Sequence, residues 1–171
     1  MNYLLKTRLG WCGIVFDGNV VKEIVLPSPD KKRIVARLKE RRYISGKQPE
    51  QTPLTKRFLK TLSRYFNGEK VDFGNPARYI SGLTRQGNFT KAVYKALMTI
   101  PYGQVRTYQW VAKRVGNPGA SRAVGNALAR NSLPVIIPCH RVIKSDGSLG
   151  NFSAIGGTEL KEKLLKMEGV R

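Results

Sequence analysis

A stretch interrupted by glycine and proline, residues 74–87, divides the 171-residue chain into two segments with different hydrophobic patterns. The segment before it opens with short apolar runs bounded by turn residues, a pattern typical of β-strands. The segment after it repeats apolar residues at helical spacing. We therefore predict a mixed α/β (α+β) fold with two domains, residues 1–78 and 89–171, joined by a linker at residues 79–88.

The N-terminal segment is predicted to form three strands and two helices. The strands are expected at Tyr3–Thr7, Trp11–Phe16 and Val20–Leu26. A hairpin turn at Asp17-Gly18-Asn19 is expected between the last two. Asp30 is placed to cap one helix, and Pro53 suits the first turn of another. Cys12 lies in an apolar strand, which favours buried packing over chemistry.

The C-terminal segment is predicted to be mainly helical. After a helix that ends near Pro101, two short helices are expected around Tyr108–Val115 and Ala120–Arg130, joined by a turn at Gly116-Asn117-Pro118-Gly119. Two short helices joined by such a turn resemble a helix-turn-helix. The second carries mostly small side chains, which allow its backbone to approach either a nucleic-acid groove or a neighbouring helix.

The charge of the chain points to a polyanionic partner. Lys plus Arg number 31 against 11 Asp plus Glu, a formal net charge of +20, and no acid occurs between Phe73 and Ser145, where eleven basic residues fall. Nucleic acid is the leading candidate. The alternatives are a merely solvated basic surface and, less favoured, an anionic membrane, for which no strongly amphipathic basic helix stands out.

Targeting signals and membrane spans are not expected. The apolar run Leu133–Cys139 is far shorter than the roughly 20 residues that a membrane span requires. Lys6 and Arg8 interrupt the N-terminal apolar segment before a signal-peptide core accumulates. We expect a cytoplasmic protein, or a nuclear one in a eukaryote, that is not secreted, and Cys12 and Cys139 are expected to remain thiols.

The sharpest chemical signal is the only histidine, His140, directly after Cys139 and before Arg141. A thiol becomes a strong nucleophile when a nearby base and positive charge favour its deprotonation. Neighbouring residues of an extended segment point apart, so Cys139 and His140 would need a turn or a bridging water to communicate.

Other chemistries compete for the same residues. One histidine and two distant cysteines do not supply the ligands of a structural zinc site, so no metal is predicted. A cysteine hydrolase stays open, because Asn131 or Glu168 could act as its third group. Such a hydrolase has no need of the +20 charge or of a helix-turn-helix.

Five motifs in register resemble the O6-alkylguanine-DNA alkyltransferase family over residues 89–170. In chain order they are Tyr102-Gly103-Gln104-Val105, Arg122-Ala123-Val124-Gly125, Asn131, Pro138-Cys139-His140-Arg141-Val142 and Leu164-Leu165-Lys166-Met167-Glu168-Gly169. The first half of the chain is similar only in size and coarse pattern to the family's small ribonuclease-H-like domain. Phe152 replaces a tyrosine common in the family, and the loop after Ser153 is longer than the family pattern.

The resemblance implies a catalytic role for each matched residue. Cys139 would be the alkyl acceptor, His140 its water-mediated base, and Glu168 the carboxylate that orients the imidazole. Asn131 would be the hinge between the recognition helix and the reactive segment. Tyr108 would donate a proton or hydrogen bond to the departing guanine.

The resemblance also implies a DNA-binding face and a substrate pocket. Arg122 would replace the extruded nucleotide in the base stack, and Leu128 would line or wedge the pocket. The remaining DNA-contacting candidates are Ser121, Ala123 and Gly125. The pocket candidates besides Tyr108 are Val142, Phe152 and Ser153, whose backbone would face the guanine oxygen.

The implied function is direct reversal of DNA damage. A monomeric, cofactor-free protein would bind double-stranded DNA through the minor groove, largely without regard to sequence, and flip O6-alkylguanine out of the duplex. The alkyl group would pass irreversibly to its own thiolate, so that each molecule acts once. Two alternatives are a helix-turn-helix regulator with an incidental cysteine and an alkyltransferase-like damage binder, although the latter lacks the acceptor cysteine that Cys139 supplies here.

Individual residues also have simpler interpretations. Tyr108 could only complete a helix core, and Asn131 could only cap a helix end. Glu168 could only pair with Lys163 or Lys166.

Overall fold

A computed structural model describes residues 2–40, 51–74 and 86–170 of the chain. The chain separates into two compact units, residues 1–84 and 85–171. Residues 79–85 of the linker predicted at 79–88 lie outside the described residues. Within the described ranges, no helix is long and apolar enough to cross a membrane.

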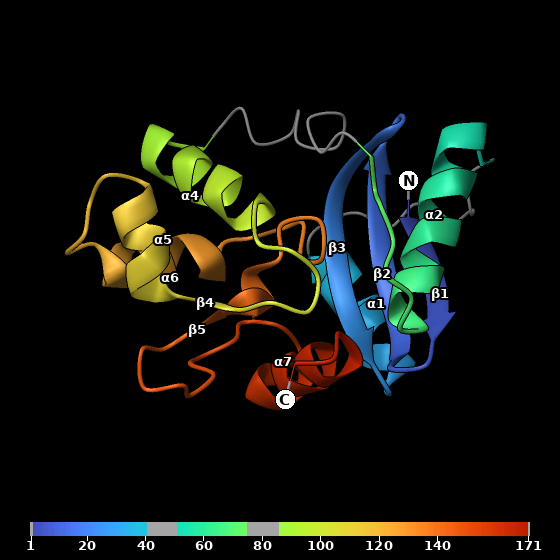
Figure 1. Ribbon diagram of the computed structural model, residues 1–171. Coiled ribbons are helices and arrows are strands. Elements are labelled where there is room, and N and C mark those ends of the chain that lie inside the picture. The colour runs from blue at the N-terminus through green and yellow to red at the C-terminus, as the bar shows by residue number, and fades with distance from the viewer. Residues whose placement is uncertain (1, 41–50, 75–85, 171) are drawn as a thin grey trace. The chain divides into compact units, whose positions relative to one another are not determined.

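The first unit is built on an antiparallel sheet of three strands in the order β1-β2-β3 (Figure 1). The strands are β1 (Asn2–Thr7), β2 (Gly10–Asp17) and β3 (Val20–Ser28). Gly18 turns the hairpin between β2 and β3 with a φ of 55°, a left-handed conformation that glycine adopts without steric cost. The three predicted strands are confirmed, each with slightly wider bounds.

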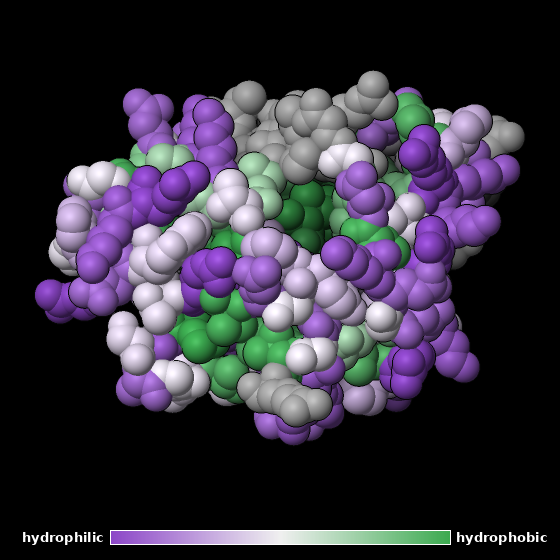
Figure 2. All heavy atoms as spheres, viewed as in Figure 1, coloured by the Kyte–Doolittle hydropathy of each residue, from purple (hydrophilic) through white to green (hydrophobic). Residues whose placement is uncertain are grey.

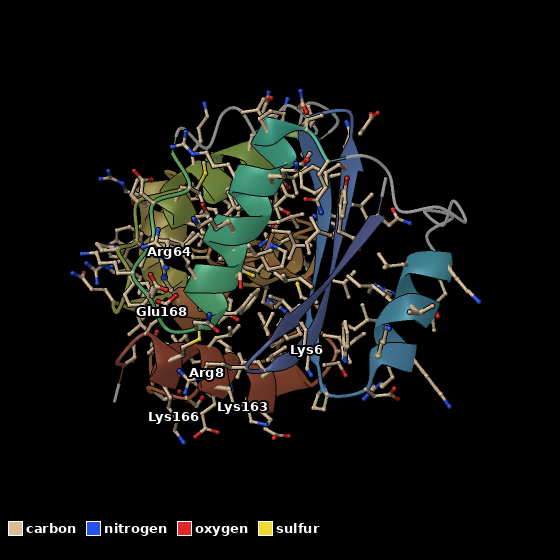
Figure 3. All side chains as sticks on the ribbon, turned by 90° about the vertical axis from the view of Figure 1, so that its right-hand side faces the viewer. Lys6, Arg8, Arg64, Lys163, Lys166 and Glu168 are labelled. Carbon is tan, nitrogen blue, oxygen red and sulfur yellow. The ribbon has the colours of Figure 1, made fainter. Side chains whose placement is uncertain are left out.

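Helices α1 (Lys31–Glu40) and α2 (Pro53–Phe66) lie on opposite faces of this sheet (Figures 1 and 3). Asp30 caps α1 by accepting a hydrogen bond of 2.8 Å from the Lys32 N–H. The Thr52 side chain caps α2, which begins at Pro53 as predicted. Aromatic rings that meet edge to face fill the core on the α2 side, so packing as well as capping holds this helix on the sheet.

Cys12 is fully buried in β2. Its Sγ donates a hydrogen bond of 3.1 Å to the Val25 carbonyl oxygen, and burial raises the pKa of the thiol far above its ordinary value. A thiol in this environment stays protonated and closed to solvent, which confirms the prediction that Cys12 packs rather than reacts.

The second unit is mainly helical. Its helices are α4 (Asn88–Met98), α5 (Tyr108–Arg114), α6 (Ser121–Ala129) and α7 (Gly157–Met167). Between α6 and α7 a short 3-10 turn, η2 (Cys139–Arg141), precedes the strand β5 (Val142–Ile143). β5 pairs in parallel with β4 (Arg106–Thr107), which directly precedes α5, so residues far apart in the chain are joined here.

Helices α5 and α6 form the predicted pair of short helices. The Thr107 side chain caps α5 by accepting from the Trp110 N–H, and Gly116 ends the helix with a φ of 79°. α4 supports α6 through Tyr94, whose buried hydroxyl donates to the Ala127 carbonyl at 3.0 Å. In Figure 2, hydrophilic side chains project at the left of the view, where Figure 1 shows α5 and α6. The pair is therefore anchored on its inner side and polar on its outer side.

Candidate active site

The segment that carries Cys139 is a series of tight turns, and the extended conformation assumed in the sequence analysis is wrong. The Ile137 N–H donates to the Leu133 carbonyl at 2.9 Å, and the Cys139 N–H donates to the Ile137 carbonyl at 2.8 Å. Val135 is buried with a φ of 77°, a strained conformation for a β-branched residue. Cys139 and His140 then occupy the same 3-10 turn.

Asn131 links the end of α6 to the thiol. Its Nδ2 donates to the Ile137 carbonyl oxygen at 2.8 Å and to the Cys139 Sγ at 3.1 Å, and its Oδ1 accepts from the Leu133 N–H at 3.0 Å. The side chain therefore holds the reactive segment in shape and donates to the sulfur directly. Donation to sulfur stabilises the thiolate relative to the thiol.

His140 and Glu168 form a buried pair. The His140 Nε2 lies 2.9 Å from the Glu168 Oε1, and both side chains have no exposed surface. Burial lowers the pKa of His140 below its ordinary value, although the Glu168 carboxylate opposes this. The ring is therefore neutral near pH 7, and a neutral ring that donates from Nε2 carries its lone pair on Nδ1. This is the tautomer of a general base whose second nitrogen is oriented by a carboxylate.

Arg141 gives Glu168 a second charged partner. The Arg141 Nε donates to Oε2 at 2.8 Å and its Nη2 donates to Oε1 at 2.9 Å, a bidentate pair. Its Nη1 donates to the Ile100 carbonyl at 2.7 Å. Burial works against ionisation of Glu168, but the hydrogen bonds from His140 and Arg141 hold the pKa of its carboxyl well below the ordinary value. Glu168 is therefore a carboxylate at neutral pH.

The alternative in which Glu168 only pairs with a surface lysine is wrong. Lys163 and Lys166 lie at the outer edge of α7 (Figure 3). They pair with Glu159 and Glu162, at 2.5 Å and 2.6 Å respectively. Glu168 follows the helix, where its carboxylate faces inward to His140 and Arg141.

Gly103 allows the backbone to approach Glu168 closely. Its N–H donates to Glu168 Oε2 at 3.2 Å, its φ is 75°, and a Cβ added there would lie 2.9 Å from the Glu168 carbonyl oxygen. We expect Gly103→Ala to lower the free energy of unfolding by about 1–3 kcal/mol, through strain and this clash. Urea titration measures the change. The control Gly119→Ala, with no atom within 4 Å of the added Cβ, should have almost no effect, and equal losses would contradict the prediction.

Lys161 is a buried cation near the thiol that sequence reasoning missed. On α7, it donates from Nζ to the Val142 carbonyl at 2.5 Å and to the Leu149 carbonyl, and the Nζ lies 5.9 Å from the centroid of the Tyr108 ring. Burial lowers the pKa of Lys161 to about 8, although the charge of Cys139 opposes this. Burial raises the pKa of Cys139, whereas the Asn131 hydrogen bond and the Lys161 charge lower it. Lys161, and not Arg141, is thus the cation that acts on the thiol.

The charge of Lys161 should set the pH at which Cys139 reacts. We expect Lys161→Met to raise the pKa of Cys139 and to move the rising limb of its alkylation rate to higher pH. Iodoacetamide labelling between pH 5 and 10, read by peptide mass spectrometry, measures this limb directly. Lys163→Met on the outer face of the same helix serves as the control and should leave the profile in place. An unmoved profile in Lys161→Met would show that its charge does not reach the thiol.

A cavity of about 650 Å³ opens beside Cys139. Its lining includes six residues predicted for the site or the DNA face: Tyr108, Ser121, Arg122, Gly125, Leu128 and Ser153. Phe152 also lines it, whereas the exposed Ala123 and the buried Val142 do not. Val142 instead offers its carbonyl oxygen to Lys161. The volume lies in the range of small-molecule sites and is large enough for a single base.

Tyr108 forms part of the cavity wall between two glycines. Its Cε1 lies 3.9 Å from where a Cβ on Gly125 would be, and its Cε2 and hydroxyl each lie 3.2 Å from where a Cβ on Gly150 would be. Burial and the charge of Cys139 raise the pKa of Tyr108. The phenol therefore keeps its proton and can donate it to a ligand. Among the residues that the structure describes, no cluster of three or more His, Cys, Asp or Glu is arranged to hold a metal ion.

Comparison with known proteins assigns the family. Residues 88–170 match the family model "6-O-methylguanine DNA methyltransferase, DNA binding domain". A methylated-DNA–protein-cysteine methyltransferase of Methanosarcina acetivorans is 41% identical over 141 residues, which are 77% of this chain and 85% of that protein. The chain belongs to the methylated-DNA–protein-cysteine methyltransferase family.

Solved structures of this methyltransferase family resemble the chain over nearly its whole length. Mycobacterium tuberculosis OGT, crystallised in complex with DNA, has a TM-score of 0.70 at 30% identity and covers 96% of this chain and 90% of its own. The O6-methylguanine-DNA methyltransferase of Pyrococcus kodakaraensis has a TM-score of 0.72 at 29% identity, over 99% of this chain and 100% of its own. Both comparisons include the first unit.

Two members of the methyltransferase site were not found from sequence. Arg141 lies in the Cys139 motif and was noted only as a nearby charge, and Lys161 was not singled out among the lysines of the C-terminal segment. Position within α7 contained a signal: Lys161 lies between Leu160 and Leu164 on the buried face of that helix. A lysine in such a position is rarely buried without a polar partner.

Proposed function

We propose that the chain is a DNA-repair alkyltransferase that takes the alkyl group of O6-alkylguanine onto Cys139. The observation that carries the proposal is the buried series Cys139, His140 and Glu168, opening on a base-sized cavity between α6 and the segment after β5. The family assignment supports the same chemistry, because the relatives bear the name methylated-DNA–protein-cysteine methyltransferase.

The reaction follows from the geometry of the site. The thiol proton passes through a bridging water to His140 Nδ1, because Nε2 is held by Glu168. The Cys139 thiolate attacks the alkyl carbon, a C–S bond forms and the bond from that carbon to guanine O6 breaks. As guanine leaves, Tyr108 donates a proton to it. Tyr108 then recovers a proton from the protonated His140 through the bridging water. A thioether has no easy reverse, so each molecule reacts once.

The lesion is proposed to reach the cavity by base flipping from the minor groove of double-stranded DNA. α6 exposes Arg122 together with the small Ala123, and Gly125 and Ser121 are half-buried beside them. Small residues let the α6 backbone enter a narrow groove, and Arg122 is the long side chain that fills the vacated place in the stack. Leu128 lines the cavity from the same helix. Affinity then comes mainly from phosphate contacts, with little dependence on sequence.

Other parts of the proposal concern the whole chain. The α5 and α6 pair serves as a helix-turn-helix, and Asn131 is the hinge that connects it to the reactive turn. The first unit is a ribonuclease-H-like support, which its three-stranded sheet with helices on both faces favours. The protein acts as a monomer in the cytoplasm or nucleus. It needs no cofactor, since the proposed chemistry uses only side chains. The domain bounds proposed from sequence are 1–78 and 89–171.

Transfer of an isotopically labelled methyl group tests the function. The protein is mixed with a duplex that carries one labelled O6-methylguanine, and the label is mapped by peptide mass spectrometry. The expected result is label on Cys139 that saturates at one methyl per protein. Tight lesion binding without transfer would instead indicate a damage-recognition protein, and absence of both would overturn the proposal.

A further inference from the structure

The cavity beside Cys139 contains two cations and no carboxylate. Arg122 enters its lining from α6, and Lys144 enters from the residue after β5. Among the described residues, neither Arg122 nor Lys144 forms an ion pair. A cavity with two cations and no acid in its lining favours an anionic ligand group.

Gly150 and Gly125 of α6 lie at opposite edges of the Tyr108 ring. Tyr108 Cε1 faces Gly125 of α6, whereas Cε2 and the hydroxyl face Gly150. Lys144 Cγ lies 3.6 Å from where a Cβ on Gly150 would be, so its stem is on the hydroxyl side. Arg122 and Lys144 therefore reach the cavity from different segments of its wall.

The backbone of Lys144 is held in a tight turn. Its N–H donates to the Ser148 carbonyl at 2.8 Å, and its carbonyl accepts from the Gly147 N–H at 3.1 Å. Asp146 in the same turn accepts from the Ser148 N–H at 2.9 Å. The hydrogen bonds from Ser148 and, to a smaller extent, the nearby Lys144 charge lower the pKa of Asp146, although Lys144 and Asp146 form no ion pair. The Lys144 side chain is exposed although it lines the cavity, so its ammonium lies at the rim.

An extruded nucleotide brings a phosphate to this rim. When the base lies beside Cys139 and Tyr108, the flanking phosphates stay with the DNA backbone, because extrusion turns the nucleotide about a backbone that remains joined to the duplex. Arg122 already has a proposed role in the base stack. Lys144 is the remaining cation of the lining, on the side of the Tyr108 hydroxyl.

We propose that Lys144 is a positioning residue that binds a phosphate flanking the extruded nucleotide. The contact holds the flipped base in the cavity through the DNA backbone, by a charge-assisted hydrogen bond from Nζ. The inference rests on the proposed function. In this proposal Lys144 helps to keep the extruded nucleotide in the cavity and takes no part in forming the C–S bond.

The experiment pairs Lys144→Met with changes in the phosphates themselves. Single-turnover transfer is measured on an O6-methylguanine duplex and on duplexes in which a neutral methylphosphonate replaces the phosphate on the 5′ or the 3′ side of the lesion. We expect Lys144→Met to lower the second-order rate about tenfold on the unmodified duplex. On one of the methylphosphonate duplexes, whose rate is already lowered, the variant should cause almost no further loss.

The matched control is Lys95→Met, which removes the same charge from an exposed residue of α4 outside the cavity lining. Lys95→Met should lower the second-order rate only slightly and equally on all three duplexes, because it changes only the overall positive charge of the protein. The proposal is overturned if Lys144→Met has no effect, if its effect equals that of Lys95→Met, or if the full tenfold loss persists on both methylphosphonate duplexes.

A binding measurement separates this inference from the proposed function. The unreactive Cys139→Ser protein, with and without Lys144→Met, is titrated with the same duplexes across a range of salt. Loss of one phosphate contact should reduce the slope of log affinity against log salt by about 0.9. Failure of transfer in the wild type would overturn the proposed function alone, whereas an unchanged slope would overturn the role of Lys144.

Discussion

Replacement of Cys139 by serine is expected to abolish alkyl transfer and to leave lesion binding intact. A serine hydroxyl stays protonated where the thiol ionises, and it is a much weaker nucleophile toward carbon. The substitution is nearly isosteric, and the hydroxyl can still accept the hydrogen bond that Asn131 Nδ2 gives to the sulfur at 3.1 Å. Single-turnover assays measure transfer, and fluorescence anisotropy measures affinity for a duplex that carries O6-methylguanine.

The control for this variant is Cys12→Ser. Cys12 belongs to the first unit and is fully buried, so its replacement can lower stability but should leave one equivalent of transfer in the folded protein. Transfer that survives in Cys139→Ser, or disappears in folded Cys12→Ser, would show that the wrong sulfur has been assigned.

Replacement of Glu168 by glutamine is expected to lower the free energy of unfolding by about 3–5 kcal/mol, because it leaves the Arg141 guanidinium buried beside a neutral partner. The amide cannot accept both bidentate hydrogen bonds of Arg141 together with the one from His140. Transfer by the folded variant should fall roughly a hundredfold, since the base loses its orientation. Urea unfolding and single-turnover transfer measure the two effects.

Glu162→Gln on the same helix is the matched control. Glu162 makes a solvent-exposed pair with Lys166, and such pairs contribute at most about 1 kcal/mol. A similar loss of stability in both variants would contradict the assignment of Glu168 as the buried centre of the network.

The pH dependence of stability provides a second readout for Glu168. Its folded pKa is depressed, so its contribution is fully present above the unfolded value of 4.5 and is lost as the pH falls toward the folded value. The pKa of His140 is also depressed, so protonation of the unfolded state reduces stability below pH 6.5. The wild type should therefore lose stability on acidification below pH 6.5. In Glu168→Gln, the part of this loss that occurs below pH 4.5 and comes from protonation of Glu168 should be absent.

Local signals in the sequence predicted most elements within a residue or two. Asp30 and Pro53 marked helix starts because a capping carboxylate and a ring without an N–H satisfy the first turn wherever they occur. The predicted helices Tyr108–Val115 and Ala120–Arg130 are observed as Tyr108–Arg114 and Ser121–Ala129. The missed strands β4 and β5 contain only two residues each, too few for any periodicity to show. The 3-10 turn η2 and the helix α7 were also not predicted.

The site was predictable in its residue types and not in its contacts. The adjacency of Cys139, His140 and Arg141 indicated a reactive thiol, and the motif register added Glu168. The sequence did not predict that Arg141 forms an ion pair with Glu168 or that Lys161 supplies the cation near the sulfur. Both outcomes depend on where α7 packs. The position of Lys161 between Leu160 and Leu164 indicates burial, but no pattern within α7 shows which groups surround it.

The sequence by itself determined the three strands and two helices of the first unit and the pair of short helices in the second, because each depends on turn, capping and periodicity signals within a few positions of one another. It also determined the family, through five short motifs in register. The tertiary structure alone decided the parallel pairing of β4 with β5, which joins the strand before Tyr108 to the one after Arg141. It also decided the left-handed backbone at Val135 and the burial of Lys161. These features are fixed by packing between segments distant in the chain, where burial and hydrogen bonding outweigh the local preferences of the residues involved.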